Sequence, residues 1–115
     1  MKKTHSLKPL KGKKLVDLVF DQGESFRSKH LLLKFFGFCD SKNFVRCGVS
    51  VGKRNFKKAV DRNKIKRQLR VVLQKKTNKM PYNGAYMLVY NAGFFINTND
   101  LVLELDLLLN KLKKH

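Results

Sequence analysis

At residues 53–76 the chain reads KRNFKKAVDRNKIKRQLRVVLQKK, the stretch that decides the fold. Its second half has the spacing of an amphipathic helix, because at 100° per residue four apolar side chains fall on one arc. These side chains are Ile65, Leu69, Val72 and Leu73. The pattern predicts a helix over 59–76 that packs this arc against a sheet, with a basic loop at 53–58 leading into it.

Further helices and strands are predicted on both sides of this helix. In chain order they are a flexible basic arm at 1–10, a helix at 13–22, strands at 29–38 and 44–51, the helix at 59–76, a strand at 85–90 and a helix at 99–113. Gly23 is the predicted C-cap of the first helix, and Asn97 or Thr98 the N-cap of the last. The strand at 44–51 is expected to pair with that at 29–38 as a hairpin, and a short extra strand near Phe26 also fits the pattern.

This order predicts one domain, residues 1–115, of the α+β class. A chain of 115 residues, 43% of them hydrophobic, has the length and the material for a single core. The expected architecture is a two-layer sandwich of a small mixed sheet with helices. Core packing explains Leu101, Leu105, Leu108 and Leu112 of the last helix. Its surplus of apolar residues leaves open a contact with a partner; these are Val102, Leu103, Leu107 and Leu109.

The charge of the chain points to a polyanionic partner. There are 26 Lys and Arg residues against 8 Asp and Glu, a formal net charge of +18. Such an excess destabilises a compact state through self-repulsion and exceeds what solubility needs. Nucleic acid is the first candidate, since each neutralised phosphate also releases a counterion, and an anionic membrane surface is the second.

The segment 53–70 concentrates this charge. It carries nine positive residues, namely Lys53, Arg54, Lys57, Lys58, Arg62, Lys64, Lys66, Arg67 and Arg70, and one negative residue, Asp61. Solvated helices ordinarily mix signs, so this face is predicted to bind phosphates. The arc next to the apolar one holds Asn63, Lys66, Arg67 and Arg70. Arg62 falls at the helix–sheet junction, where it can reach an adjoining groove, whereas Lys64 points elsewhere.

No catalytic or metal-binding cluster is evident. The eight acids are scattered, and Asp17 and Asp21, which share a helix face and could hold an ion, are better explained as a solvated pair. His30 begins a strand with no evident partner. Cys39 and Cys47 are expected to be two buried thiols, although a disulfide between them is geometrically possible.

Nothing in the sequence predicts a membrane protein. The basic start of the chain has no apolar run behind it, so no signal peptide is expected. No apolar stretch approaches the roughly 18 residues needed to span a bilayer. The expected location is the cytoplasm.

The run SVGKRNFKKAVDRNKIKRQLR, residues 50–70, resembles the signature of the protein subunit of bacterial ribonuclease P. That signature is a basic loop, a small residue matching Ala59, and the pattern Arg-Asn-Arg/Lys-x-Lys-Arg-x-x-Arg. Phe20 and Gly23 also stand in the family's usual places, and the layout of elements fits over nearly the whole chain. The resemblance implies a fold like the second domain of ribosomal protein S5.

The resemblance also implies a function. The partner is a catalytic RNA that uses Mg²⁺, held mainly by RNA and substrate, to hydrolyse precursor tRNA to its mature 5′ end, with one protein per RNA. The protein would bind the catalytic RNA through Lys53, Arg54, Lys57, Lys58, Arg67 and Arg70. It would hold the 5′ leader of precursor tRNA in a cleft between the first helix and the sheet, through Phe20, Lys34, Arg62, Asn63 and Lys66. No catalytic residue and no metal ligand is expected in this chain.

The sequence departs from the family pattern at three positions, and the one at Lys34 puts the base preference in the leader in doubt. Val16 stands where phenylalanine is frequent, and Lys34 where some members have a cleft tyrosine, so stacking of leader bases is reduced there. Lys64 replaces arginine, which keeps the charge but loses the bidentate fork.

Competing hypotheses are a ribosomal protein, a DNA-packaging protein and a free-standing nuclease, which would cut RNA without an RNA cofactor.

Overall fold

The computed structural model describes residues 6–9, 13–37, 44–76 and 84–114. In chain order the elements are β1 (Ser6–Pro9), α1 (Lys13–Gln22), β2 (Glu24–Arg27), β3 (Leu31–Gly37), β4 (Phe44–Val51), α2 (Ala59–Lys75), β5 (Gly84–Tyr90) and α3 (Thr98–Lys114). The helices and strands predicted from the sequence are all present, within two residues at each described end. The short strand near Phe26 is confirmed as β2.

The five strands form one mixed sheet in the order β1-β4-β5-β3-β2. Strand β3 is antiparallel to both of its neighbours, β2 and β5. Strand β4 is parallel to both of its neighbours, β1 and β5. The pairing of 29–38 directly with 44–51 predicted from the sequence is therefore wrong, because β5 lies between these two strands. Helix α2 makes the connection from β4 to its parallel neighbour β5.

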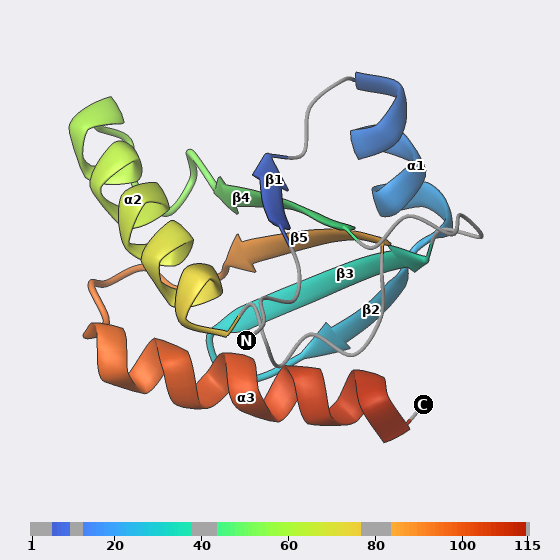
Figure 1. The fold of residues 1–115 in the computed structure, drawn as a ribbon. Coiled ribbons are helices and arrows are strands. Elements are labelled where there is room, and N and C mark those ends of the chain that lie inside the picture. Colours follow the sequence, from blue (N-terminus) through green and yellow to red (C-terminus); the bar gives the residue numbers. More distant parts are fainter. Residues whose placement is uncertain (1–5, 10–12, 38–43, 77–83, 115) are drawn as a thin grey trace.

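Alternation along β3 and β5 separates two faces of the sheet. Leu31, Leu33 and Phe35 of β3 join the main core, where they meet the apolar sides of α2 and α3. The buried side chains of α2 are the four predicted ones, Ile65, Leu69, Val72 and Leu73. The main core thus lies between a layer formed by the sheet and a layer formed by α2 and α3, which confirms the predicted α+β sandwich (Figure 1).

Helix α1 packs on the opposite face of the sheet. Val19 is fully buried there against Ala85 and Met87, with Val16 and Phe36 beside them. This second cluster is small, and Leu32, Lys34 and Val89 on the same face remain partly exposed. Helix α1 therefore covers this face only in part, and the partly exposed area beside α1 is called the half-open face.

The predicted flexible arm is wrong at residues 6–9. This segment is strand β1, paired in parallel with β4 from Ser6 opposite Phe44 to Pro9 opposite Cys47. Proline donates no ladder hydrogen bond, and it is accommodated because β1 is the edge strand. The rest of the predicted arm lies outside the described residues.

The last helix begins as predicted. The side-chain Oδ1 of Asn97 accepts a hydrogen bond from the backbone N–H of Asp100 at 2.8 Å, which makes Asn97 the N-cap. Leu101, Leu105, Leu108 and Leu112 are buried, and so is Leu109, whereas Leu103 and Leu107 are exposed. Only these last two remain available for a partner. No helix in the described part of the chain is long and apolar enough to cross a membrane.

Candidate nucleic-acid interface

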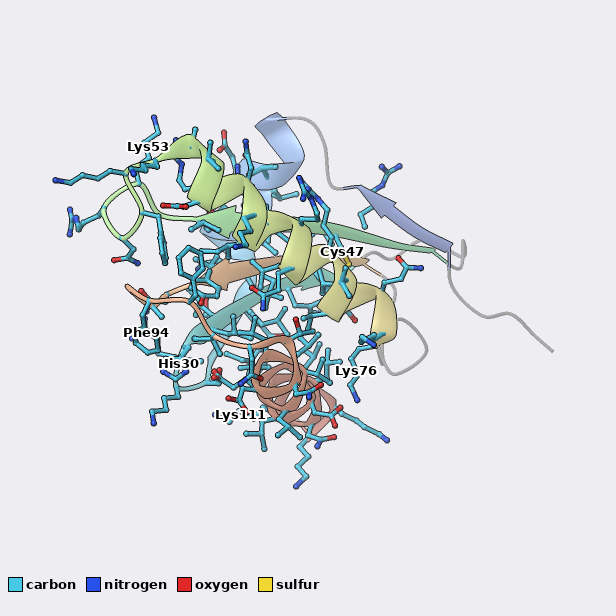
Figure 2. All side chains as sticks on the ribbon, turned by 90° about the vertical axis from the view of Figure 1, so that its left-hand side faces the viewer. His30, Cys47, Lys53, Lys76, Phe94 and Lys111 are labelled. Carbon is cyan, nitrogen blue, oxygen red and sulfur yellow. The ribbon has the colours of Figure 1, made fainter. Side chains whose placement is uncertain are left out.

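The basic loop at 53–58 is a compact turn anchored to the core. The N–H groups of Asn55 and Phe56 both donate to the carbonyl of Gly52, at 3.2 and 3.3 Å. The ring of Phe56 is buried against Phe95 and Tyr90, with ring centroids 5.2 and 6.0 Å apart. The cationic side chains of the loop are exposed, namely Lys53, Arg54, Lys57 and Lys58. Lys53 extends from this end of the molecule in Figure 2.

Arg62 ties this loop to the first turn of α2. Its Nη1 donates to the carbonyl oxygens of Phe56 and Lys57, both at 2.8 Å. Lys58 at the N-cap supplies no side-chain cap, so the guanidinium is what holds the loop to the helix. The sequence predicted Arg62 at the helix–sheet junction, reaching an adjoining groove, whereas in the structure its Nη1 binds the carbonyls of the loop.

The outward side of α2 carries positively charged side chains. Asn63, Arg67 and Arg70 are exposed, and Lys66 is half-buried at the edge of the core. These side chains occupy the predicted arc beside the buried one, at spacings of three and four residues. The backbone of α2 therefore holds several positive groups in fixed relative positions, as binding to a phosphate backbone requires.

Phe20 and Lys34 meet on the half-open face of the sheet. The Phe20 ring is 38% exposed, and Lys34 Nζ lies 5.5 Å from its centroid. Lys34 Nζ also donates to Ser25 Oγ at 2.9 Å, from the neighbouring strand. An exposed ring can stack on a base, and a cation beside it can bind the phosphate of the same nucleotide.

The predicted site residues form two groups in space. Within the described residues, no hydrogen bond, ion pair or ring contact joins Phe20 or Lys34 to Arg62, Asn63 or Lys66. Figure 1 shows α1 and the first turn of α2 on either side of β1 and β4. A nucleic acid that touches both groups has to cross this part of the sheet.

His30 has a partner that sequence reasoning missed. Its Nδ1 lies 2.7 Å from Glu104 Oε2, while its backbone N–H and Ser28 Oγ both donate to Glu104 Oε1, at 2.7 and 2.6 Å. Burial by itself raises the pKa of Glu104, but these hydrogen bonds and the charge of His30 outweigh it, and the pKa lies below the ordinary 4.5. The cluster fastens the turn before β3 to α3. The separation of His30 and Glu104 by 74 positions in the sequence explains why no local pattern revealed the contact.

Replacing Glu104 with glutamine should lower the free energy of unfolding by about 1.5 kcal/mol at neutral pH, because charge-assisted hydrogen bonds are lost. The folded-state pKa of Glu104 is depressed, so its stabilisation is present above about pH 4.5 and is lost as pH falls through the folded pKa. Urea unfolding of both proteins should show the difference shrinking as the pH falls below the ordinary pKa of 4.5. Asp17→Asn, at an exposed carboxylate, is the control. A difference that is independent of pH would contradict this role.

Cys47 is an unreactive thiol. It packs against the main core, and burial raises its pKa to about 12. Such a thiol stays protonated at neutral pH, so it is neither a nucleophile nor a ready metal ligand. Cys47 is free in this structure, and Cys39 lies outside the described residues.

No metal-binding cluster is found in the described part of the chain, where no three or more His, Cys, Asp or Glu side chains lie together. Asp17 and Asp21 are both exposed on α1. Mg²⁺ is therefore not matched by a donor set among the described residues.

Comparisons with known proteins agree with this architecture. A family model described as ribonuclease P matches residues 1–113. The fold is similar to that of the Staphylococcus aureus RNase P protein, with a TM-score of 0.77 at 20% identity over 91% of this chain and 94% of that one. It is also similar to the RNase P protein from Thermotoga maritima, with a TM-score of 0.76 at 19% identity over 90% and 96%. No curated protein sequence matches the chain.

Proposed function

Because the chain belongs to the ribonuclease P protein family, we propose that it is the protein subunit of a ribonuclease P that matures the 5′ ends of tRNA. In this role it binds a catalytic RNA and the 5′ leader of precursor tRNA, as one protein per RNA, in the cytoplasm. The observation that carries the proposal is the dense positive charge of the basic loop and of α2, where Asp61 is the one acidic residue, built on a well-packed core.

The basic loop and the outward side of α2 are proposed to bind the catalytic RNA. Lys53, Arg54, Lys57 and Lys58 project from a turn whose geometry is fixed by Phe56 and Arg62. Arg67 and Arg70 continue this surface along the helix. Because the backbone that carries these side chains is already ordered, binding loses little backbone entropy, which favours a structured RNA partner.

The half-open face beside α1 is proposed to hold the leader. Phe20 offers a partly exposed ring, and Lys34 a cation above it. Asn63 and Lys66 extend the binding surface from α2, where an amide can both donate and accept toward a base or a 2′-hydroxyl. Arg62 contributes by positioning the basic loop, and its remaining N–H groups can face phosphate.

Hydrolysis itself is assigned to the RNA partner. Mg²⁺ supplies Lewis-acid chemistry in such a reaction, held by RNA and substrate phosphates. This chain contributes by neutralising phosphates and by positioning the leader. The alternative hypothesis is a free-standing nuclease, and Ser28, His30 and Glu104 do not support it. Glu104 accepts hydrogen bonds that join the turn before β3 to α3.

Phe20→Ala should weaken binding of precursor tRNA to the assembled enzyme by about tenfold and spare mature tRNA, because one base loses its stacking partner. Equilibrium binding of the two tRNAs in Ca²⁺, which slows cleavage, measures this difference. Phe94→Ala, which removes an exposed ring remote from α1, should affect neither tRNA. Equal losses for precursor and mature tRNA would exclude Phe20 from leader binding.

A further inference from the structure

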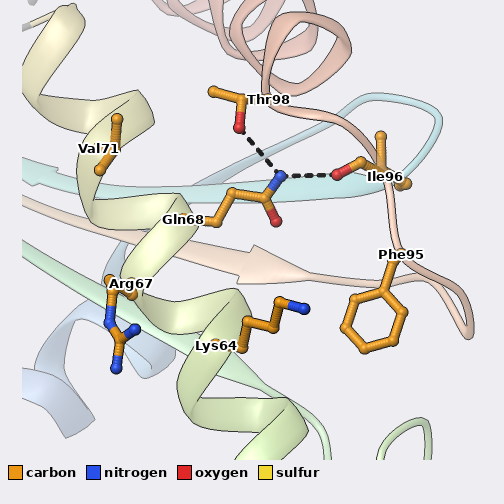
Figure 3. A pocket seen from close by; sticks show the side chains of 7 residues that line it. All are labelled: Lys64, Arg67, Gln68, Val71, Phe95, Ile96 and Thr98. Atoms are coloured by element: carbon orange, nitrogen blue, oxygen red, sulfur yellow. Dashed lines mark hydrogen bonds between the residues drawn. The ribbon is translucent and has the colours of Figure 1, made fainter.

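A pocket with aromatic and cationic side chains lies on the side of the sheet that α2 and α3 cover, away from Phe20 and Lys34. It is an open pocket of about 380 Å³ between α2 and the segment that leads into α3 (Figure 3). Its lining residues are Lys64, Arg67, Gln68 and Val71 from α2, Phe95 and Ile96 from the segment, and Thr98 at the start of α3. Lys64 was counted in the basic segment 53–70 but placed outside its predicted arc, and Phe95 was not among the predicted site residues.

Phe95 forms an aromatic platform in this pocket. Its ring is 54% exposed, although an apolar ring of this size is ordinarily buried. Phe56 supports it at 5.2 Å between ring centroids, so the platform is attached to the core. Lys64 Nζ lies 5.5 Å from the ring centroid. Stacking of a base is stronger than an exposed cation–π contact, so a base can take the place of the flexible lysine.

Gln68 presents a fixed acceptor to the same pocket. Its Nε2 donates to the carbonyl of Ile96 at 2.7 Å and to Thr98 Oγ1 at 3.2 Å, which fixes the orientation of the amide. Its Oε1 is then left without a hydrogen-bond donor among the described residues (Figure 3). An acceptor held in this way can receive a hydrogen bond from an amino or imino group of a base.

The charges around the pocket favour a phosphate. Lys64 and Arg67 are both among its lining residues, and none of the lining residues is acidic. The adjoining pocket contains Asp100 and Glu104 as well as Lys29 and His30, so it lacks an excess of positive charge. The two pockets share Phe95 and Ile96, so the contrast in charge arises over a short distance.

We propose that this pocket binds one nucleotide of a single-stranded RNA segment. The base stacks on Phe95, Gln68 Oε1 accepts a hydrogen bond from it, and Lys64 and Arg67 hold the phosphate. The proposal rests on the proposed function for the identity of the RNA. Two sources have the required chemistry, an unpaired nucleotide of the catalytic RNA and one of precursor tRNA.

The test uses the absence of tryptophan from the chain. Phe95→Trp introduces a single tryptophan at the platform, and Phe94→Trp introduces one at a neighbouring ring of similar exposure, 57%, in the adjoining pocket. Each variant is titrated with catalytic RNA, and then, once assembled, with precursor tRNA. Stacking should quench Phe95→Trp at least threefold more than Phe94→Trp, in one titration or the other. The titration that quenches identifies the source of the nucleotide.

Phe95→Leu, which keeps an apolar side chain but removes the ring, tests the site without a probe. It should lower the affinity for the RNA identified by quenching by about tenfold, with its thermal unfolding checked in parallel. Equal quenching at positions 94 and 95, or unchanged affinity of folded Phe95→Leu for both RNAs, would overturn the proposal. Failure of the wild-type protein to bind catalytic RNA would instead contradict the proposed function.

Discussion

Replacing Arg67 and Arg70 together with alanine should lower the affinity of the protein for catalytic RNA by about 30-fold. Both guanidinium groups are exposed on the outward side of α2, and each is expected to form a charge-assisted contact with phosphate. Two such contacts at an exposed surface contribute about 2 kcal/mol together. Binding should also become less sensitive to salt, with the slope of log K against log salt reduced by about 1.8.

The control for this variant removes the same charge elsewhere. Lys113 and Lys114 are exposed in the last turn of α3, and their double replacement with alanine leaves the same net charge. Affinity for catalytic RNA should then change by less than about threefold, because only long-range attraction is reduced. Filter binding at several salt concentrations measures both variants. Equal losses for the two pairs would mean that α2 is not the specific contact surface.

Gly23→Ala should lower the free energy of unfolding by about 3 kcal/mol, because the added methyl group has no room. A Cβ at this position would lie 2.3 Å from the carbonyl oxygen of Val19 and 2.8 Å from that of Phe35. Both obstacles are backbone atoms, so no side-chain rotation relieves them. The Gly23 N–H donates to Val19 at 2.9 Å as the helix ends. Residue 23 is therefore a point of close contact between α1 and β3, and the substitution should displace the helix beside the proposed leader site.

Gly93→Ala is the matched control, since a Cβ there would meet nothing within 4 Å. Thermal unfolding should show a decrease of roughly 12 °C for the first variant and little change for the second. Similar Tm values for wild type and Gly23→Ala would show that α1 can move away from β3 without loss of stability.

The sequence predicted those parts of the fold that have a local signal. The helical phase of Ile65, Leu69, Val72 and Leu73 identified the buried side of α2, and with it the exposed positions of Arg67 and Arg70. Asn97 was among the predicted caps because capping depends on residues close in sequence. The prediction of Gly23 at the end of α1 was also correct in position. The structure adds that close contact with backbone oxygens of both α1 and β3, rather than an unusual backbone angle, requires glycine there.

Features that depend on distant segments could not be predicted in this way. Strand β1 has only four residues, one of them proline, and exists because β4 is available as a parallel partner. The insertion of β5 between β3 and β4 has no local signature either. The pocket between Lys64 and Phe95 and the partnership of His30 with Glu104 likewise need tertiary contacts. Polar residues far apart in sequence become a cluster only when packing brings their elements together.

Cleavage of precursor tRNA at low Mg²⁺, with protein alone, catalytic RNA alone and both together, is the most direct test of the central claim. The account predicts that only the mixture cuts efficiently, and that the product has the mature 5′ end, because protein cations replace part of the Mg²⁺ needed to neutralise RNA. Cleavage by the protein alone would place an active site in this chain. A mixture no more active than the catalytic RNA alone would contradict the assignment of this protein as its subunit.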